Sequence, residues 1–141
     1  MSGNVLEMVD INPITVHDFN EVTLQGIKME TKNEGDVTLV LVNPRFDPIT
    51  SKEIETKLTA IVDGGAKKLL CDFSSTEYIS SAGLRVMLSA VKKLQKSGGK
   101  MVLSCMQPFV SSVFKMAGFD QIFEICETKE QAMASLKRVS P

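Results

Sequence analysis

The sequence has few of the residues that build metal, redox and catalytic centres. It contains no tryptophan, one histidine (His17) and three cysteines, Cys71, Cys105 and Cys126, with no Cys-x-x-Cys pair. An odd number of isolated cysteines at the ends of apolar runs is typical of buried, reduced thiols rather than of disulfides or a metal site. We therefore expect no metal and no cofactor.

An excess of charge of one sign and long hydrophobic runs are also missing. The chain has 16 Lys and Arg against 17 Asp and Glu, a net charge of -1. This balance argues against nucleic acid as a direct partner, and the small cluster of Lys92, Lys93 and Lys96 is typical of a solvated helix face. No window approaches the roughly 18 apolar residues of a membrane span, and residues 1–20 show no export signal. We expect a cytoplasmic protein without a membrane segment.

Catalytic motifs are absent as well. A Ser-His-Asp arrangement would have to use His17, which lies in an unpatterned segment, and the carboxylates nearest to the serine-rich turn are Asp72 and Glu77. A nucleophilic serine needs a base held beside it. No glycine-rich phosphate loop of either common form is present. We predict a protein that is not an enzyme.

Short apolar runs alternate with segments of helical spacing from residue 37 onward, which indicates an α/β domain. Residues 1–25 show no period and form an N-terminal extension of uncertain structure, whereas residues 26–141 form one domain. Its expected order is β-β-α-β-α-β-α-β-α. The strands are predicted at 26–31, 37–42, 68–73, 101–105 and 121–126, and the helices begin near Thr50 or Ser51, near Ser80 or Ser81, after Pro108 and at Thr128.

A hydroxyl-rich turn follows the central strand. It reads Ser-Ser-Thr-Glu-Tyr-Ile-Ser-Ser-Ala-Gly-Leu over residues 74–84. Ser80 or Ser81 can cap the next helix, a contact worth about 1 kcal/mol. The same position leaves a hydroxyl at the positive end of a helix, where an added phosphate is tolerated. In open α/β sheets function collects at this carboxyl edge, so the turn is the predicted site.

The turn and two further segments resemble the STAS domain family of bacterial anti-sigma factor antagonists. The similar segments are 71–85, whose Ser-Ser-Ala-Gly-Leu resembles the family's Asp-Ser-Ser-Gly-Leu-like turn, the Gly-Gly and strand of 98–103, and the helix and Gly-Phe-Asp-x-x-Phe of 113–123. They occur in the family's order and spacing, and the resemblance covers roughly residues 26–138.

The resemblance implies a single STAS-like α/β domain, with a mixed sheet of four to five strands and helices packed mainly on one side. It also implies partner switching. The unmodified domain binds an anti-sigma factor that is itself a serine kinase; phosphorylation of a loop serine releases it, and a PP2C-type phosphatase restores binding. Such a protein would be a monomer or a weak homodimer.

By alignment on Gly83 and Leu84, the family's phosphoacceptor falls on Ser81. This chain departs from the motif at Ser80, where the family often has an acidic residue, and at Ala82, where it often has a second serine, so Ser80 is an alternative acceptor. The expected partner-binding residues are Phe46, Asp47, Ser80, Ser81, Ala82 and Arg85.

Two of these assignments have alternatives. Phe46 is equally compatible with a core position, and Arg85 with a solvated charge. The rival function is a STAS scaffold, or a module that senses a small ligand or nucleotide, in which the two serines serve only to cap the helix.

Overall fold

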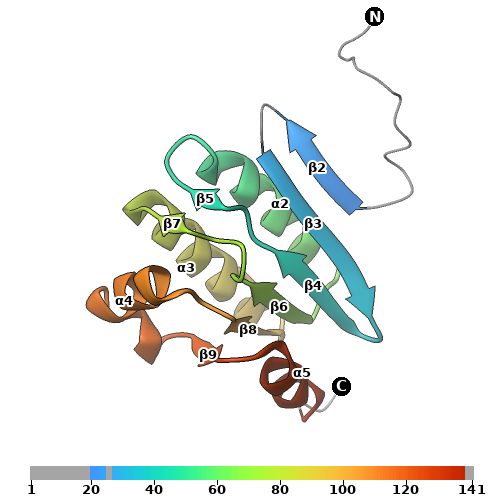
Figure 1. The fold of residues 1–141 in the computed structure, drawn as a ribbon. Helices are drawn as coiled ribbons and strands as arrows, with labels where there is room; N and C mark the ends of the chain where they lie inside the picture. Colours follow the sequence, from blue (N-terminus) through green and yellow to red (C-terminus); the bar gives the residue numbers. More distant parts are fainter. Residues whose placement is uncertain (1–19, 25–26, 139–141) are drawn as a thin grey trace, which may run out of the picture.

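The computed structural model describes residues 20–24 and 27–138 of the chain. Its main sheet has the strand order β2-β3-β4-β6-β8-β9 (Figure 1). The strands are β2 (Asn20–Leu24), β3 (Ile27–Glu34), β4 (Val37–Leu41), β6 (Lys68–Asp72), β8 (Lys100–Ser104) and β9 (Glu124–Cys126). The β2–β3–β4 pairings are antiparallel and the β4–β6–β8–β9 pairings are parallel, so the sheet is mixed, as predicted.

Most of the helices cover one face of this sheet. These are α2 (Ser51–Asp63), α3 (Ser81–Lys96) and α4 (Pro108–Met116), followed by the short 3-10 helix η2 (Phe119–Gln121). The last helix, α5 (Lys129–Lys137), packs on the opposite face against β6 and β8. The α/β class and the one-sided helix packing are confirmed.

The described sheet has one strand more than the four or five expected. The additional strand, β2, lies in the segment that showed no period in the sequence, and it pairs with β3 along its whole length. A separate two-stranded sheet joins β5 (Arg45–Phe46) to β7 (Tyr78–Ile79). A short edge strand can form because it pairs with its neighbour, even when its own sequence shows no clear alternation of apolar and polar residues.

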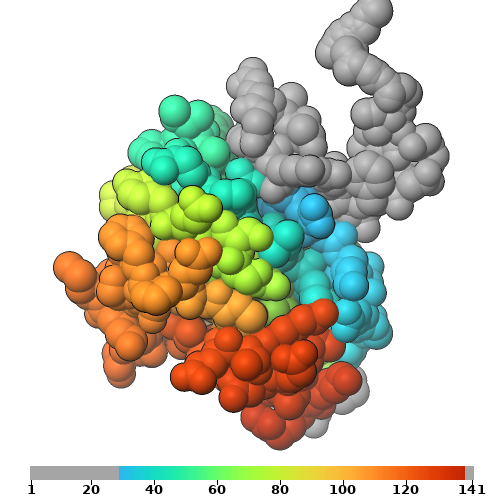
Figure 2. Space-filling model, viewed as in Figure 1, coloured from blue at the N-terminus to red at the C-terminus, as the bar shows by residue number. Residues whose placement is uncertain are grey.

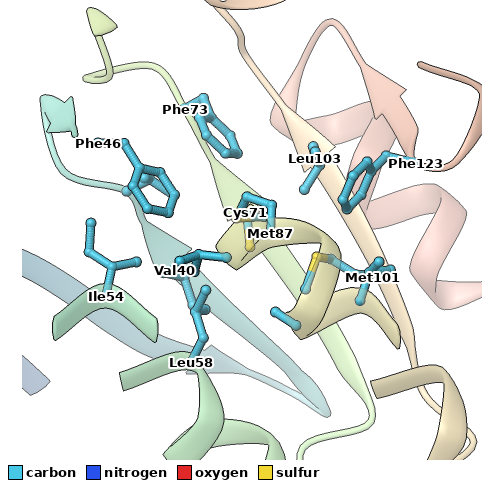
Figure 3. Packing of buried hydrophobic residues seen from close by; sticks show 14 of the residues in the cluster. Val40, Phe46, Ile54, Leu58, Cys71, Phe73, Met87, Met101, Leu103 and Phe123 are labelled. Carbon is cyan, nitrogen blue, oxygen red and sulfur yellow. The ribbon is translucent and has the colours of Figure 1, made fainter. Parts of the chain in front are cut away.

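The central strands are apolar on both faces because both faces are covered. Val40, Cys71 and Leu103 point toward α2 and α3, where Ile54 and Met87 also lie (Figure 3). The alternate residues of the same strands form a second cluster with α5, made of Val37, Leu39, Leu70, Val102, Ala132 and Leu136. A parallel strand buried on both sides appears in a sequence as a continuous apolar run, which explains the segments 37–42 and 68–71.

The three predicted buried thiols have different environments. Cys71 is fully buried, and this burial raises the pKa of its thiol to about 12. Cys105 and Cys126 are only partly buried and lie at the ends of β8 and β9. Burial is therefore confirmed for Cys71 and was overstated for the other two, because the carboxyl ends of these strands reach the edge of the sheet.

Candidate functional site

The candidate site is built from two loops that β5 and β7 hold together. Arg45 pairs with Tyr78 and Phe46 with Ile79 in a parallel bridge. The Ser80 backbone N–H then donates to the Phe46 carbonyl at 2.9 Å. The loop after β4 and the loop after β6 thus share one edge of the sheet, as the sequence predicted. The segments of β5, β7 and α4 adjoin on the surface in Figure 2.

Ser80 and Ser81 occupy different positions at the start of α3. Ser80 is the N-cap, with extended backbone angles, and its Oγ accepts a hydrogen bond from the Gly83 N–H at 3.3 Å. Ser81 is the first residue of the helix, and its side chain is exposed. Among the described residues, the Ser81 hydroxyl has no hydrogen-bond partner. The cap is therefore Ser80, and Ser81 presents the accessible hydroxyl.

Gly83 allows the first turn of α3 to pack tightly against the neighbouring loop. A Cβ added at this position would lie 2.8 Å from Cγ1 of Ile79 and 2.9 Å from the backbone oxygen of Phe46. Both distances are too short for a real contact. The glycine thus sets the position of Ser81 relative to β5, a packing role that the motif alone does not reveal.

Phe46 lies in the core. Its side chain has 0% exposure and points toward Ile54 and Val40 (Figure 3). Of the two positions compatible with the sequence, the structure selects the buried one, so its side chain does not belong to the contact surface of this conformation. Its contribution to the site is structural: its backbone pairs with the end of β7, and its carbonyl accepts the N–H of Ser80 at the start of α3.

Asp47 organises the start of α2. Its Oδ1 accepts hydrogen bonds from the backbone N–H groups of Ile49 and Thr50, both at 3.0 Å. Its Oδ2 lies 3.3 Å from Nε of Arg45. The hydrogen bond from Thr50, together with those from Arg45 and Ile49, lowers the pKa of the Asp47 carboxyl. Asp47 is therefore a fixed negative charge at the sheet edge that carries Ser81.

Three residues that the sequence did not single out form a stack across β5, β7 and the first turn of α4. The Arg45 guanidinium carbon lies 4.6 Å from the centroid of the Tyr78 ring. The Tyr78 and Phe109 rings are stacked, with centroids 6.2 Å apart and planes inclined by 13°. Phe109 is 53% exposed. Arginine and aromatic side chains are enriched at binding hot spots. The sequence does contain a signal that could have identified them. An arginine or an aromatic residue occurs in each of the segments that follow β4, β6 and β8.

Ala82 and Arg85 lie on the side of α3 that faces α2. Ala82 is half-buried and Arg85 is exposed, and both line an open hollow with Ser51 and Glu55 of α2. The structure thus brings Asp47, Ser80, Ser81, Ala82 and Arg85 to one region. Arg85 is at the solvated position that the sequence left open.

The Ser81 hydroxyl lies at the N-terminus of a helix, where it can serve as an acceptor for phosphate. Asp72 is occupied in the preceding turn, where its Oδ1 accepts the Ser74 N–H at 2.8 Å. His17 lies outside the described residues. Within the described part of the chain, no group of three or more His, Cys, Asp or Glu residues is placed to hold a metal ion, and no helix is long and apolar enough to span a bilayer.

Comparison with known proteins agrees with this architecture. BtrV of Bordetella bronchiseptica, named as a candidate anti-sigma factor antagonist, is 38% identical over 91 residues, which cover 64% of this chain and 78% of BtrV. A crystal structure from Thermotoga maritima with the same kind of name has a TM-score of 0.73 at 22% identity, covering 77% of this chain and 94% of that one.

The phosphorylated form of the Bacillus cell fate determinant SpoIIAA has the same fold, with a TM-score of 0.61 at 17% identity, covering 76% of this chain and 97% of SpoIIAA. The model of the STAS domain matches residues 28–132. This range covers the main-sheet strands β3, β4, β6, β8 and β9 except for Ile27, together with the β5–β7 bridge and the whole candidate site. The chain belongs to the STAS domain family.

Proposed function

We propose that the chain is an anti-sigma factor antagonist that works by partner switching in the cytoplasm. In its unmodified form it binds an anti-sigma factor that is also a serine kinase. The kinase phosphorylates Ser81 and the complex dissociates, and a PP2C-type phosphatase regenerates the binding form. The observation that carries the proposal is the division of roles between adjacent serines: Ser80 caps α3, while Ser81 presents a free, exposed hydroxyl.

The surroundings of Ser81 support a switch that needs no refolding. A phosphate at the first position of α3 meets the positive end of the helix, whose first turn carries no acidic residue. The fold can thus accommodate the modification. The phosphate still adds about -1.5 to -2 charges to the surface, at the sheet edge that also carries the Asp47 carboxylate, next in sequence to the Phe46 carbonyl that accepts the Ser80 N–H.

The expected effect on binding is large. A charge placed in a docked interface without a prepared partner costs about 2–5 kcal/mol, which corresponds to roughly 30-fold to several thousand-fold in affinity. The names of the relatives support the antagonist role: BtrV is named as a candidate anti-sigma factor antagonist, and the SpoIIAA structure is of a phosphorylated form.

Intact-mass spectrometry tests the acceptor. The protein is incubated with ATP and a serine kinase of the anti-sigma type from the same genome, and the wild type is compared with Ser81→Ala and Ser80→Ala. A single phosphate that is absent only in Ser81→Ala supports the proposal. Loss only in Ser80→Ala moves the acceptor by one residue, and no phosphate on any variant favours the scaffold or sensor function.

A binding measurement tests the switch itself. Isothermal titration of the same kinase with the unmodified protein and with the purified phosphorylated form should show at least about 30-fold weaker binding after phosphorylation. Equal affinities would contradict partner switching even if Ser81 is phosphorylated.

A further inference from the structure

The outer face of α3 carries a stripe of positive charge. Arg85, Lys92 and Lys96 follow one another after seven and four residues and are all exposed, and Ser89 lies between them at helical spacing. The helix also contains Lys93 and has no aspartate or glutamate. In a chain whose net charge is -1, these cations are concentrated on one element.

The stripe forms no ion pair with the described part of the fold, although Glu55 of α2 lines the same hollow as Arg85. Within the described side chains, no carboxylate lies at ion-pair distance from Arg85, Lys92 or Lys96, whereas Lys93 is 3.7 Å from Asp63. Three lysines on the α5 side of the sheet are paired with carboxylates at shorter distances. These pairs are Lys68–Asp36 at 2.9 Å, Lys100–Glu124 at 3.0 Å and Lys129–Glu34 at 3.2 Å.

A shallow groove follows the stripe along the exposed side of α3, and α2 bounds it only in its first part. Its first part is a hollow of about 590 Å³ between α2 and α3. Ser51 and Glu55 of α2 line this part together with Ala82, Arg85, Ser89 and Lys92 of α3. The second part shares Ser89 and Lys92 and continues to Lys96 as an open surface formed by α3 alone. The groove therefore begins at Ala82, beside Ser81, and ends near the last turn of the helix.

We propose that this groove, which we call the α3 groove, binds an acidic helical segment of the protein that docks over Ser81. The proposal rests on the proposed function and specifies the chemistry of its partner. Helix α3 is 16 residues long, so the groove extends over roughly 24 Å, and carboxylates at helical spacing can face its cations. Complementary charge of this kind chiefly raises the association rate and fixes the register of docking.

The position of the groove links it to the switch. Ser81 precedes Ala82 at one end of the groove, so a phosphate on Ser81 places its negative charge where the acidic segment arrives. Repulsion between the two then adds to the desolvation cost. A nucleic acid is the poorer occupant, because no aromatic side chain lines the described groove and the cations cover a single helix.

A designed peptide tests the groove without the natural partner. The probe is an 18-residue helical peptide with glutamates at the spacing of residues 85, 89, 92 and 96, and its binding is followed by amide chemical shifts. Shifts should appear along α3 from Ala82 to Lys96. The variant K92E/K96E should bind about tenfold more weakly, whereas the matched control K115E/K137E, on α4 and α5, should bind like the wild type.

Anion controls decide whether the groove selects protein. The same peptide with glutamine in place of glutamate should not bind. A 12-base-pair DNA duplex and vesicles containing phosphatidylserine should bind more weakly than the acidic peptide. If either anion shifts the same residues with equal or greater affinity, the proposal of an acidic protein segment is wrong.

The anti-sigma kinase separates this inference from the proposed function. Stopped-flow association with the kinase should be slowed about tenfold by K92E/K96E, with less effect at high salt. An unchanged rate with K92E/K96E overturns the α3 groove and leaves the Ser81 switch intact. An affinity that does not depend on Ser81 phosphorylation overturns the switch, whatever the groove does.

Discussion

The two faces of the sheet are closed by different means. On one face, α2, α3 and α4 cover the larger core cluster, which includes a group of aromatic rings around Phe114. On the other, Ala132 and Leu136 of α5 pack on four buried strand residues, and ion pairs such as Lys100–Glu124 and Lys129–Glu34 lie beside them. Ion pairs therefore tie α5 and its neighbouring strands together, whereas Arg85, Lys92 and Lys96 on α3 form none with the described side chains.

The contrast shows which kinds of side chain hold the helices on each face of the sheet. A large apolar cluster holds α3 in place without using the charges on its outer side, so Arg85, Lys92 and Lys96 remain available for a partner. The small α5 cluster has less apolar area, and its charged neighbours complete the contact with the sheet. Four predictions test this comparison, in order of decreasing expected effect.

The largest effect is expected from Phe114→Ala. Phe114 is fully buried, and its ring lies 5.8 Å from those of Phe73 and Phe123 and 6.2 Å from that of Phe119. Removing a buried phenylalanine costs about 3–5 kcal/mol. Urea denaturation should show a larger loss than for Leu136→Ala on the α5 face. A greater loss from Leu136→Ala would show that the α5 cluster contributes more to stability than the larger cluster does.

Gly83→Ala should destabilise the α3 side by about 1–3 kcal/mol. The new Cβ would lie within 3.0 Å of Phe46 and Ile79, and the resulting strain exceeds the roughly 1 kcal/mol that alanine gains over glycine in a helix. Ser89→Ala, an exposed substitution in the same helix, is the matched control and should be close to neutral. Thermal unfolding measures both variants. A stabilised Gly83→Ala protein would contradict the close packing.

The adjacent serines should differ in stability. Ser80→Ala removes the oxygen that accepts the Gly83 N–H and should cost about 1 kcal/mol. Ser81→Ala removes an exposed hydroxyl and should stay within about 0.5 kcal/mol of the wild type. Chemical denaturation of the two variants measures the difference. A larger loss from Ser81→Ala would show that Ser81 has a structural role that the hydrogen bonds do not reveal.

The smallest effect concerns pH on the α5 side. Hydrogen bonds from Ser135 and Lys100 lower the pKa of Glu124 below 4.5. A carboxyl with a lowered folded-state pKa stabilises the protein above its unfolded pKa, and this contribution is lost as the pH falls through the folded value. Because Glu124 is partly solvated, the loss should be under about 1 kcal/mol.

Urea midpoints at pH 7 and at pH 3 measure this contribution. The wild type should lose more stability than Glu124→Gln between the two pH values, because the variant has no proton to take up at this position. An equal loss in both proteins would show that Glu124 does not contribute.

The sequence predicted the regular elements well and the joined loops poorly. Runs such as 68–71 identify buried strands because both sheet faces are covered, and the serine pair identifies the helix start because capping is local. Two features depend on contacts between segments that are far apart in the chain. They are the buried position of Phe46 and the stack of Arg45, Tyr78 and Phe109. Neither leaves a periodic signal within a single segment.

The β5–β7 bridge has a consequence for how this chain can vary during evolution. Arg45 and Phe46 are paired with Tyr78 and Ile79 in a fixed register, and Asp47 and Ser80 follow directly. An insertion of one residue in the loop before β5 or in the loop before β7 would shift both of these pairs. The shift would separate Arg45 from Tyr78 and would also displace Ser81. The lengths of the two loops should therefore be conserved together in related sequences, while their exposed side chains can change with the partner.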